Sequence, residues 1–160
     1  MTDRSVTYTT FTIERSYPAA PARVFAAFAD AEAKARWADD PDLLHLPEGG
    51  DDSEFDFRVG GRERFGFKMP DGSTYGYDAL YYDIVPDQRI VYCYEMYADG
   101  ARTSVSVATI EFVVDGAGTS LTYTEQGAYL DGIDRPEDRR EGTELMLDNL
   151  VRVLSAEAAG

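Results

Sequence analysis

The stretch from Glu63 to Tyr97, ERFGFKMPDGSTYGYDALYYDIVPDQRIVYCYEMY, decides the fold of this chain. Apolar and polar residues alternate along it in three runs, and a period of two is typical of half-buried β-strands. The segments Pro70-Asp71-Gly72 and Pro86-Asp87 separate the runs, and both are typical of tight turns. Three strands joined by such short turns predict an antiparallel meander.

The same alternation continues on both sides of this stretch. Runs at 7–17, 55–59, 102–114 and 120–126 predict four more strands, which gives seven in all. Six of the seven follow one another with short turns between them, so we expect neighbouring strands along the chain to be neighbours in the sheet.

Helices are predicted at three places. Pro21 suits the first turn of a short helix after the first strand, and Asp30 can cap a second helix that runs to about Trp37. Near the C-terminus, Asp134 and Glu137 have the spacing of a capping box, and they predict the start of a long helix. We expect its buried stripe to centre on four residues, flanked by Leu147, Leu150 and Leu154: Gly142, Met146, Asn149 and Val153.

The order of elements is one strand, two short helices, six strands and one long helix. Helices gathered on one face of an antiparallel sheet define the α+β class. The chain of 160 residues is long enough for one substantial core, and nothing in it suggests a linker, so residues 1–160 are predicted to form a single domain.

Composition limits the kinds of partner that we expect. The net charge is −15, which disfavours nucleic acids and anionic membranes. One cysteine, no apolar leader at the N-terminus and no apolar run long enough to span a membrane point to a cytoplasmic protein. One histidine and one cysteine are too few for an ordinary zinc site, so no metal and no cofactor are expected.

Several stretches resemble one family. Residues 15–30 (RSYPAAPARVFAAFAD) followed by Trp37, residues 56–61 (DFRVGG), 84–91 (IVPDQRIV) and 118–126 (GTSLTYTEQ) resemble, in this order, the bacterial Hsp90-ATPase-activator-homologue (AHSA1-like) branch of the START/Bet v 1-like (SRPBCC) superfamily. The resemblance implies a helix-grip fold, in which a curved seven-stranded sheet wraps a long C-terminal helix and leaves a cavity between them. Members of the superfamily bind lipids, hormones or polyketides, and some are cyclases or hydrolases.

The aromatic residues are the most informative local signal for a binding site. Seven of the eleven tyrosines fall between Tyr75 and Tyr97, and alternation places many of them on one face of the sheet. Rings with a few placed hydroxyls suit a pocket for a small hydrophobic or aromatic molecule, although they also suit ordinary core packing. The residues expected to line such a pocket are Trp37, Phe57, Phe65, Phe67, Tyr92, Tyr94, Met96, Tyr123, Gly142, Met146 and Asn149.

One carboxylate is a weak catalytic candidate. Glu125 shares a strand face with Leu121 and Tyr123, and it could pair with Arg15 or act as a base in the pocket. The two remaining candidates are interpreted as structural residues and not as catalytic ones. His45 lies between leucines without a triad motif, and Cys93 alternates with tyrosines in a strand.

Three functions therefore stay open. The first is binding of a small apolar or aromatic molecule without catalysis. The second is an enzyme of the cyclase, aromatase or hydrolase kind that uses a cavity carboxylate or tyrosine as acid or base. The third is a chaperone-associated protein-interaction domain, and a homodimer is compatible with each of the three.

Overall fold

The computed structural model describes residues 4–38, 44–45 and 53–159. Along the chain the elements are β1 (Val6–Tyr17), α1 (Pro21–Ala29), α2 (Ala31–Ala38), β2 (Leu44–His45), β3 (Glu54–Phe55), β4 (Arg62–Lys68), β5 (Thr74–Val85), β6 (Arg89–Ala98), β7 (Ala101–Asp115), β8 (Gly118–Leu130) and α3 (Pro136–Ala159). This order confirms the predicted α+β class, with two short helices after the first strand.

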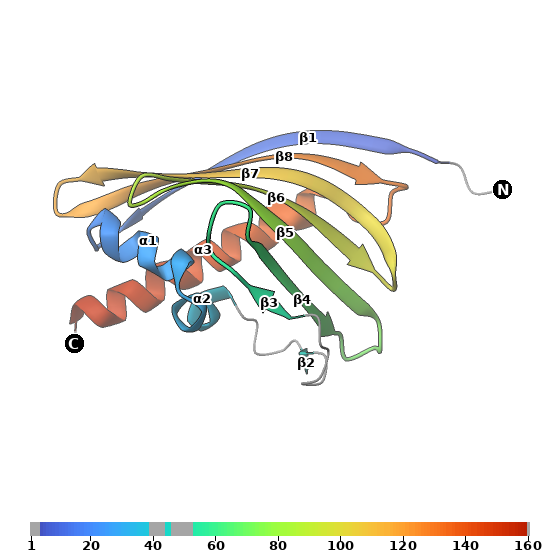
Figure 1. Ribbon diagram of the computed structural model, residues 1–160, viewed down its shortest axis with the longest axis horizontal. Helices are drawn as coiled ribbons and strands as arrows, with labels where there is room; N and C mark the ends of the chain where they lie inside the picture. Colours follow the sequence, from blue (N-terminus) through green and yellow to red (C-terminus); the bar gives the residue numbers. More distant parts are fainter. Residues whose placement is uncertain (1–3, 39–43, 46–52, 160) are drawn as a thin grey trace.

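The strands form one antiparallel sheet in the order β1-β8-β7-β6-β5-β4-β2, and β3 also pairs with β4. The sheet curves around α3, which runs diagonally across its concave side, so the predicted helix-grip fold is confirmed (Figure 1). Strand β2 was not predicted, because it has two residues and lies within a segment that reads as a loop. Most of that segment, residues 39–43 and 46–52, lies outside the described part of the chain.

The predicted strand at 55–59 is much shorter than expected. Only Glu54 and Phe55 pair with β4, because the chain then folds back in a tight turn. In this turn the amide of Gly61 donates to the carbonyl of Arg58, and a Cβ on Gly61 would overlap the carbonyl oxygen of Asp56. The close backbone approach ends the strand and requires glycine at this position.

Two irregularities contribute to the curvature of the sheet. The pairing of β5 with β6 shifts register between Tyr81 and Asp83, and that of β6 with β7 shifts between Met96 and Tyr97. An extra residue on one strand bends it and increases its twist. The shift in β5 leaves Tyr82 on the convex side, 57% exposed, while Tyr81 stays buried.

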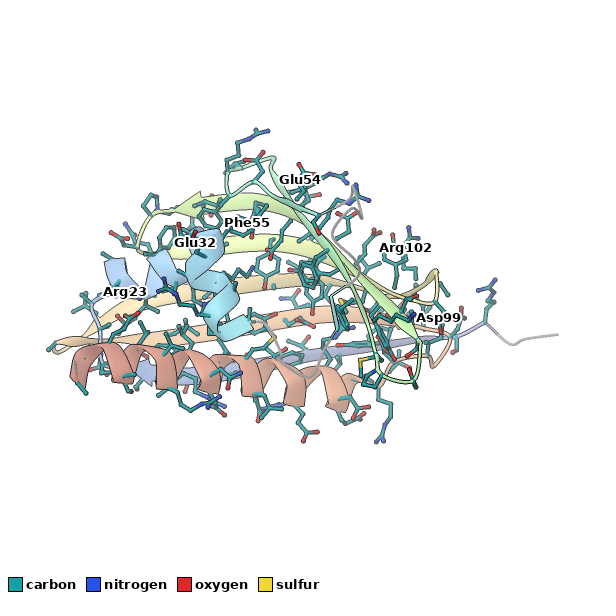
Figure 2. The ribbon with its side chains drawn as sticks, turned by 90° about the horizontal axis from the view of Figure 1, so that it is seen from below. Arg23, Glu32, Glu54, Phe55, Asp99 and Arg102 are labelled. Carbon is teal, nitrogen blue, oxygen red and sulfur yellow. The ribbon has the colours of Figure 1, made fainter. Side chains whose placement is uncertain are left out.

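Much of the hydrophobic core lies where α1 packs against the sheet. Val24, Phe25 and Phe28 of α1 are buried against the sheet, and Phe25 and Phe28 contact the Phe112 ring edge-on, each with 5.6 Å between centroids. In the view turned by 90°, α1 and α2 lie between α3 and the arm of the sheet that carries β4 and β5 (Figure 2). Arg23, labelled there, connects α1 with α3, because its Nη2 donates to Oε1 of Glu157 at 2.6 Å.

The residues at two element ends explain how the chain caps a helix and reverses between strands. The Asp30 carboxylate accepts a hydrogen bond from the amide of Ala33 at 2.9 Å, so it caps α2 as predicted. Between β6 and β7, Asp99 and Gly100 have φ values of 47° and 84°, the left-handed values that a two-residue hairpin turn needs.

The buried stripe of α3 differs from the prediction. It consists of Thr143, Leu147, Leu150 and Leu154, whereas Met146 is 38% exposed and Gly142 is exposed. The expected centre of the stripe was therefore about a quarter turn away from the real one, because the flanking leucines face the sheet. In the described part of the chain, no helix is both long enough and apolar enough to cross a membrane.

Candidate functional site

The concave face of the sheet presents rows of aromatic side chains. Strand register aligns Tyr77 on β5 with Met96 on β6 and Ser104 on β7, and two rows further along the same face it aligns Tyr81 with Tyr92. Since alternate residues of paired strands share a face, these side chains all point towards α3 and the helices beside it.

One part of this face keeps its rings partly exposed. We call it the open aromatic surface, and it consists of Phe57, Phe65, Phe67, Tyr77, Tyr92 and Met96. Phe65 is 38% exposed, and the other members are half-buried. By contrast, the concave residues of β7, β8 and β1 are buried, as Ile110, Leu121 and Ile13 show. The concave side therefore has a closed part and an open part.

The rings of the open aromatic surface stack in a continuous series. Phe65 and Tyr77 stack with 4.7 Å between centroids, and Tyr77 stacks on Tyr94 at 5.2 Å. Tyr94 lies 5.9 Å from Tyr92, which leads on to Tyr81 at 5.8 Å. Offset and edge-on ring pairs of this kind stabilise one another, so the surface is a preformed one.

One side of α3 borders the open aromatic surface. At 3.6 residues per turn, Gly142 and Met146 lie between Arg139, which contacts β6, and Asn149, which faces α2. A Cβ added to Gly142 would have no atom within 4 Å. Gly142 is also exposed, so this side of the helix is open and not packed against another element.

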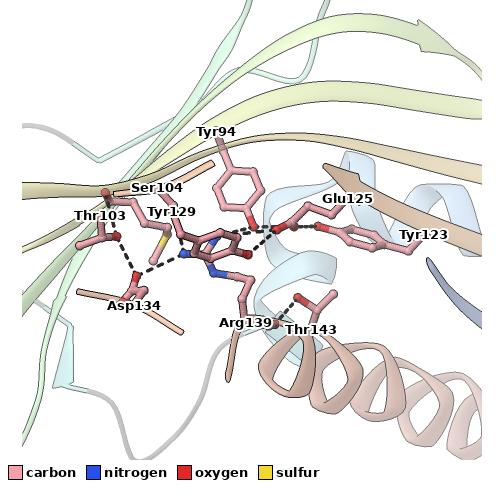
Figure 3. Close-up of polar contacts among 10 residues, drawn as sticks. Tyr94, Thr103, Ser104, Tyr123, Glu125, Tyr129, Asp134, Arg139 and Thr143 are labelled. Carbon is pink, nitrogen blue, oxygen red and sulfur yellow. Dashed lines mark hydrogen bonds and ion pairs between the residues drawn. The ribbon is translucent and has the colours of Figure 1, made fainter. Parts of the chain in front are cut away.

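A buried polar cluster adjoins the open aromatic surface, and we call it the Glu125 cluster (Figure 3). Glu125 has no exposed surface, and its Oε1 accepts hydrogen bonds from the hydroxyls of Tyr94 at 2.5 Å and Tyr123 at 2.7 Å. Its Oε2 lies 3.5 Å from the Tyr129 hydroxyl and 3.7 Å from Nη1 of Arg139. The carboxylate is therefore paired and hydrogen-bonded, as a buried charge must be.

Arg139 is the residue that links this cluster to α3. Its Nη2 donates to Ser104 at 2.8 Å and to Asp134 at 3.3 Å, and its Nη1 donates to Tyr94 at 3.1 Å. The guanidinium also lies over the ring of Tyr129, 5.2 Å from the centroid. These contacts fix the beginning of α3 on the concave face.

The phenols of the concave face remain protonated over a wide pH range. Burial raises the pKa of Tyr94 and Tyr123 well above the ordinary value, and the nearby Glu125 carboxylate raises both further. Burial also raises the pKa of Tyr77 and Tyr92. At neutral pH all four hydroxyls can donate as well as accept a hydrogen bond.

A second polar group lies at the other side of the open aromatic surface, and we call it the Glu63 cluster. Oε2 of Glu63 accepts from Nζ of Lys34 at 2.6 Å and from the hydroxyl of Tyr81 at 2.8 Å. Glu63 is 6% exposed, and the Lys34 ammonium also lies 5.6 Å from the centroid of Phe55. These bonds satisfy a buried carboxylate beside the rings.

The expected pairing of Glu125 with Arg15 is wrong. Nε of Arg15 bonds Asp148 on α3 at 2.7 Å, and Arg139 takes the place beside Glu125. The carboxylate is enclosed by tyrosines and an arginine, so it has no free oxygen facing the open space. A free general base needs access to the proton that it removes.

The predicted pocket residues fall into three groups. Phe57, Phe65, Phe67, Tyr92 and Met96 lie on the open aromatic surface, Tyr94 and Tyr123 lie in the Glu125 cluster, and Gly142, Met146 and Asn149 lie along the adjoining side of α3. Trp37 is apart from them: it is 3% exposed, packs on Phe28 and donates from Nε1 to the carbonyl of Ala27 at 3.0 Å. It belongs to the core between α1 and α2.

Sequence reasoning missed the residues that complete both polar clusters. Arg139 stands four residues before Thr143 and eight before Leu147, so its spacing puts it in line with the buried stripe. This signal was available, but a charged residue in line with leucines is normally assigned to a solvated edge. The pairing of Lys34 with Glu63 has no such signal in the sequence. The two residues are far apart in the chain, and they meet because α2 places Lys34 beside β4.

Neither a metal site nor the convex face offers a better candidate among the described residues. Within the described ranges, no group of three or more His, Cys, Asp or Glu residues could hold a metal ion. An open depression of about 500 Å³ lies on the convex side of β1, β8 and β7, around Tyr8, Val105 and Val107. It is broad and mostly lined by aliphatic and threonine side chains, so it lacks the convergent polar groups of a specific site.

Comparison with known proteins gives a family match. The family model described as "Activator of Hsp90 ATPase homolog 1-like protein" matches residues 18–155. No curated protein matches the chain.

Several solved structures are similar over nearly their whole length. The Mll3558 protein from Rhizobium loti is 47% identical, with 92% of this chain and 98% of that chain covered and a TM-score of 0.83. An uncharacterized protein from Rhizobium leguminosarum is 41% identical, with 97% and 99% covered and a TM-score of 0.85. The AHSA1 protein SPO3351 from Silicibacter pomeroyi shares the fold at 22% identity, with 93% and 99% covered and a TM-score of 0.69. None of these descriptions names a ligand or a reaction.

Proposed function

Because the chain belongs to the Activator of Hsp90 ATPase homolog 1-like family, whose helix-grip fold fits a ligand-binding domain, we propose that this protein binds a small aromatic molecule. The molecule lies against the open aromatic surface, in the space beside Gly142 of α3. One observation carries the proposal: Phe65, Phe67, Tyr77 and Tyr92 on β4, β5 and β6 keep partly exposed rings on the concave side, whereas the concave residues of β7 and β8 are buried.

Partly exposed rings on a concave face are costly unless something covers them. Each Å² of apolar surface removed from water contributes about 25 cal/mol, so a planar ligand that covers several rings gains several kcal/mol. The stacked series from Phe65 through Tyr77 to Tyr94 holds these rings in place before binding, which lowers the entropy lost on association.

Catalysis by Glu125 receives less support. Both oxygens of this carboxylate are engaged by tyrosine hydroxyls or by Arg139, and the residue has no exposed surface. A chaperone-associated role, which the family description suggests, would be detected as co-purification of the protein with a chaperone.

Binding is tested by titrating the purified protein with N-phenylnaphthylamine, an uncharged dye that fluoresces in apolar surroundings. We expect saturable binding, and we expect Phe65→Ala to weaken it roughly fivefold or more, because a ring contact contributes about 1 kcal/mol beyond its area. The matched control is Tyr8→Ala, which removes a ring that is 79% exposed on the convex side. Binding that does not saturate, or an equal loss in both variants, would contradict the proposal.

A further inference from the structure

Two tyrosine hydroxyls of the open aromatic surface are placed to meet a ligand. Tyr77 and Tyr92 are half-buried, and each lies beside the ring of Tyr94. The hydroxyl of Tyr94 in turn donates to Glu125 at 2.5 Å. The phenols of Tyr77, Tyr92 and Tyr94 therefore lie side by side on one region of the concave face, where a polar group of a ligand can reach those of Tyr77 and Tyr92.

This region lies between two buried carboxylates. The ring of Tyr92 lies 5.8 Å from that of Tyr81, whose hydroxyl donates to Glu63. It lies 5.9 Å from the ring of Tyr94, whose hydroxyl donates to Glu125, so Tyr92 lies between the partners of the two carboxylates. The negative field of two carboxylates repels an anion and favours the neutral form of a phenol.

The cations of the two clusters are already engaged. Lys34 is held by Glu63 at 2.6 Å, and Arg139 lies between Glu125 at 3.7 Å and Asp134 at 3.3 Å. Three carboxylates thus face two cations, in a chain whose net charge is −15. A carboxylate or phosphate that entered here would lose its hydration without gaining an unpaired cation from either cluster.

We infer that the polar group recognised at this surface is an uncharged hydroxyl, so that the ligand is a neutral hydroxylated aromatic compound rather than an organic acid. A hydroxyl can donate to one tyrosine oxygen and accept from the other, whereas a carboxylate can only accept. The inference rests on the proposed binding function, since it specifies which aromatic molecules the same surface prefers.

Three compounds of nearly equal size separate the alternatives: naphthalene, 2-naphthol and 2-naphthoate. Calorimetric titration at neutral pH should show 2-naphthol binding roughly five- to tenfold tighter than naphthalene, which is the effect of about one net hydrogen bond. The anion 2-naphthoate should bind more weakly than naphthalene.

Conservative variants locate the effect. The double variant Tyr77→Phe/Tyr92→Phe keeps both rings, so naphthalene should still bind, but the preference for 2-naphthol should disappear. Tyr82→Phe removes a hydroxyl on the convex side and should leave the preference unchanged. The comparison of the three compounds on the wild-type protein does not depend on how well the variants fold.

Each other outcome has a defined meaning. If naphthalene binds and 2-naphthol binds no tighter, or if 2-naphthoate binds tightest, the inference about the hydroxyl is overturned while the binding function stands. If none of the three compounds binds and the uncharged dye does not either, the proposed function itself is overturned, and the inference falls with it.

Discussion

Among the described residues, Ser106 is the one whose buried side-chain polar atom has no hydrogen-bond partner. Its side chain is 1% exposed, and among the described residues its hydroxyl has no hydrogen bond. Two positions earlier on β7, Ser104 is equally buried but accepts a hydrogen bond from Arg139 at 2.8 Å. The two serines therefore form a natural pair for measuring what the Glu125 cluster contributes to stability.

We expect Ser106→Ala to leave the free energy of unfolding unchanged or to raise it by about 1 kcal/mol, because an unsatisfied buried hydroxyl is itself destabilising. Ser104→Ala should lower it by about 1 to 3 kcal/mol, since a donor of the buried Arg139 then loses its acceptor. Urea unfolding followed by circular dichroism measures both changes. A loss of stability in Ser106→Ala as large as that in Ser104→Ala would show that Ser106 has a partner after all.

At the scale of the element, α3 shows where sequence reasoning reaches its limit. The helix was predicted from a capping box at Asp134 and Glu137 and from its periodicity. It begins at Pro136, but the Asp134 carboxylate accepts hydrogen bonds from Thr103 and Arg139, so the capping box is not what starts the helix. The side of the helix that faces the sheet was not predicted correctly. Leu145, Met146 and Leu147 are consecutive, and each could lie at the centre of an apolar stripe. The contacts of Arg139 with β6 and of Arg15 with Asp148 fix the rotation, and they join residues more than 40 positions apart.

A pair of truncations tests this rotation. Leu150 has no exposed surface, so Leu150→Ala should lower the free energy of unfolding by about 2 to 5 kcal/mol. Met146 is 38% exposed, and Met146→Ala should cost less than about 1 kcal/mol. Thermal or urea unfolding gives both values. Equal losses would mean that the helix presents its Met146 side to the sheet.

The sheet itself was more predictable than the site. Alternation and turn residues located β4 to β7 closely, because each strand is marked by its own side chains and by the glycine or proline beside it. Strand β8 was found but is longer than the predicted 120–126, since it runs from Gly118 to Leu130. Alternation also assigned Phe65, Tyr92, Tyr94 and Tyr123 to one face. It does not say which charged residue meets Glu125, since Arg15 and Arg139 are both compatible with the pattern and only packing in three dimensions chooses between them.

For the whole molecule, the tyrosines of the concave side make the free energy of unfolding depend on pH. Burial raises the pKa of seven of them above the ordinary value: Tyr17, Tyr77, Tyr81, Tyr92, Tyr94, Tyr123 and Tyr129. For Tyr129 the raised value is about 12. In the unfolded chain each would ionise near the ordinary tyrosine value of about 10.

Alkaline pH should therefore unfold this protein cooperatively. Below about pH 10 both states keep the phenolic protons, and these groups contribute no pH dependence. Above it the unfolded chain releases protons that the folded protein retains, so the free energy of unfolding falls by about 1.4 kcal/mol per pH unit for each such tyrosine. Urea unfolding between pH 9 and 12 measures the decline, and the absorbance of seven of the eleven tyrosinates should rise together with the loss of structure. Tyr77→Phe has one phenol fewer and should decline less steeply, whereas ionisation of more than four tyrosines before unfolding would contradict the burial of these hydroxyls.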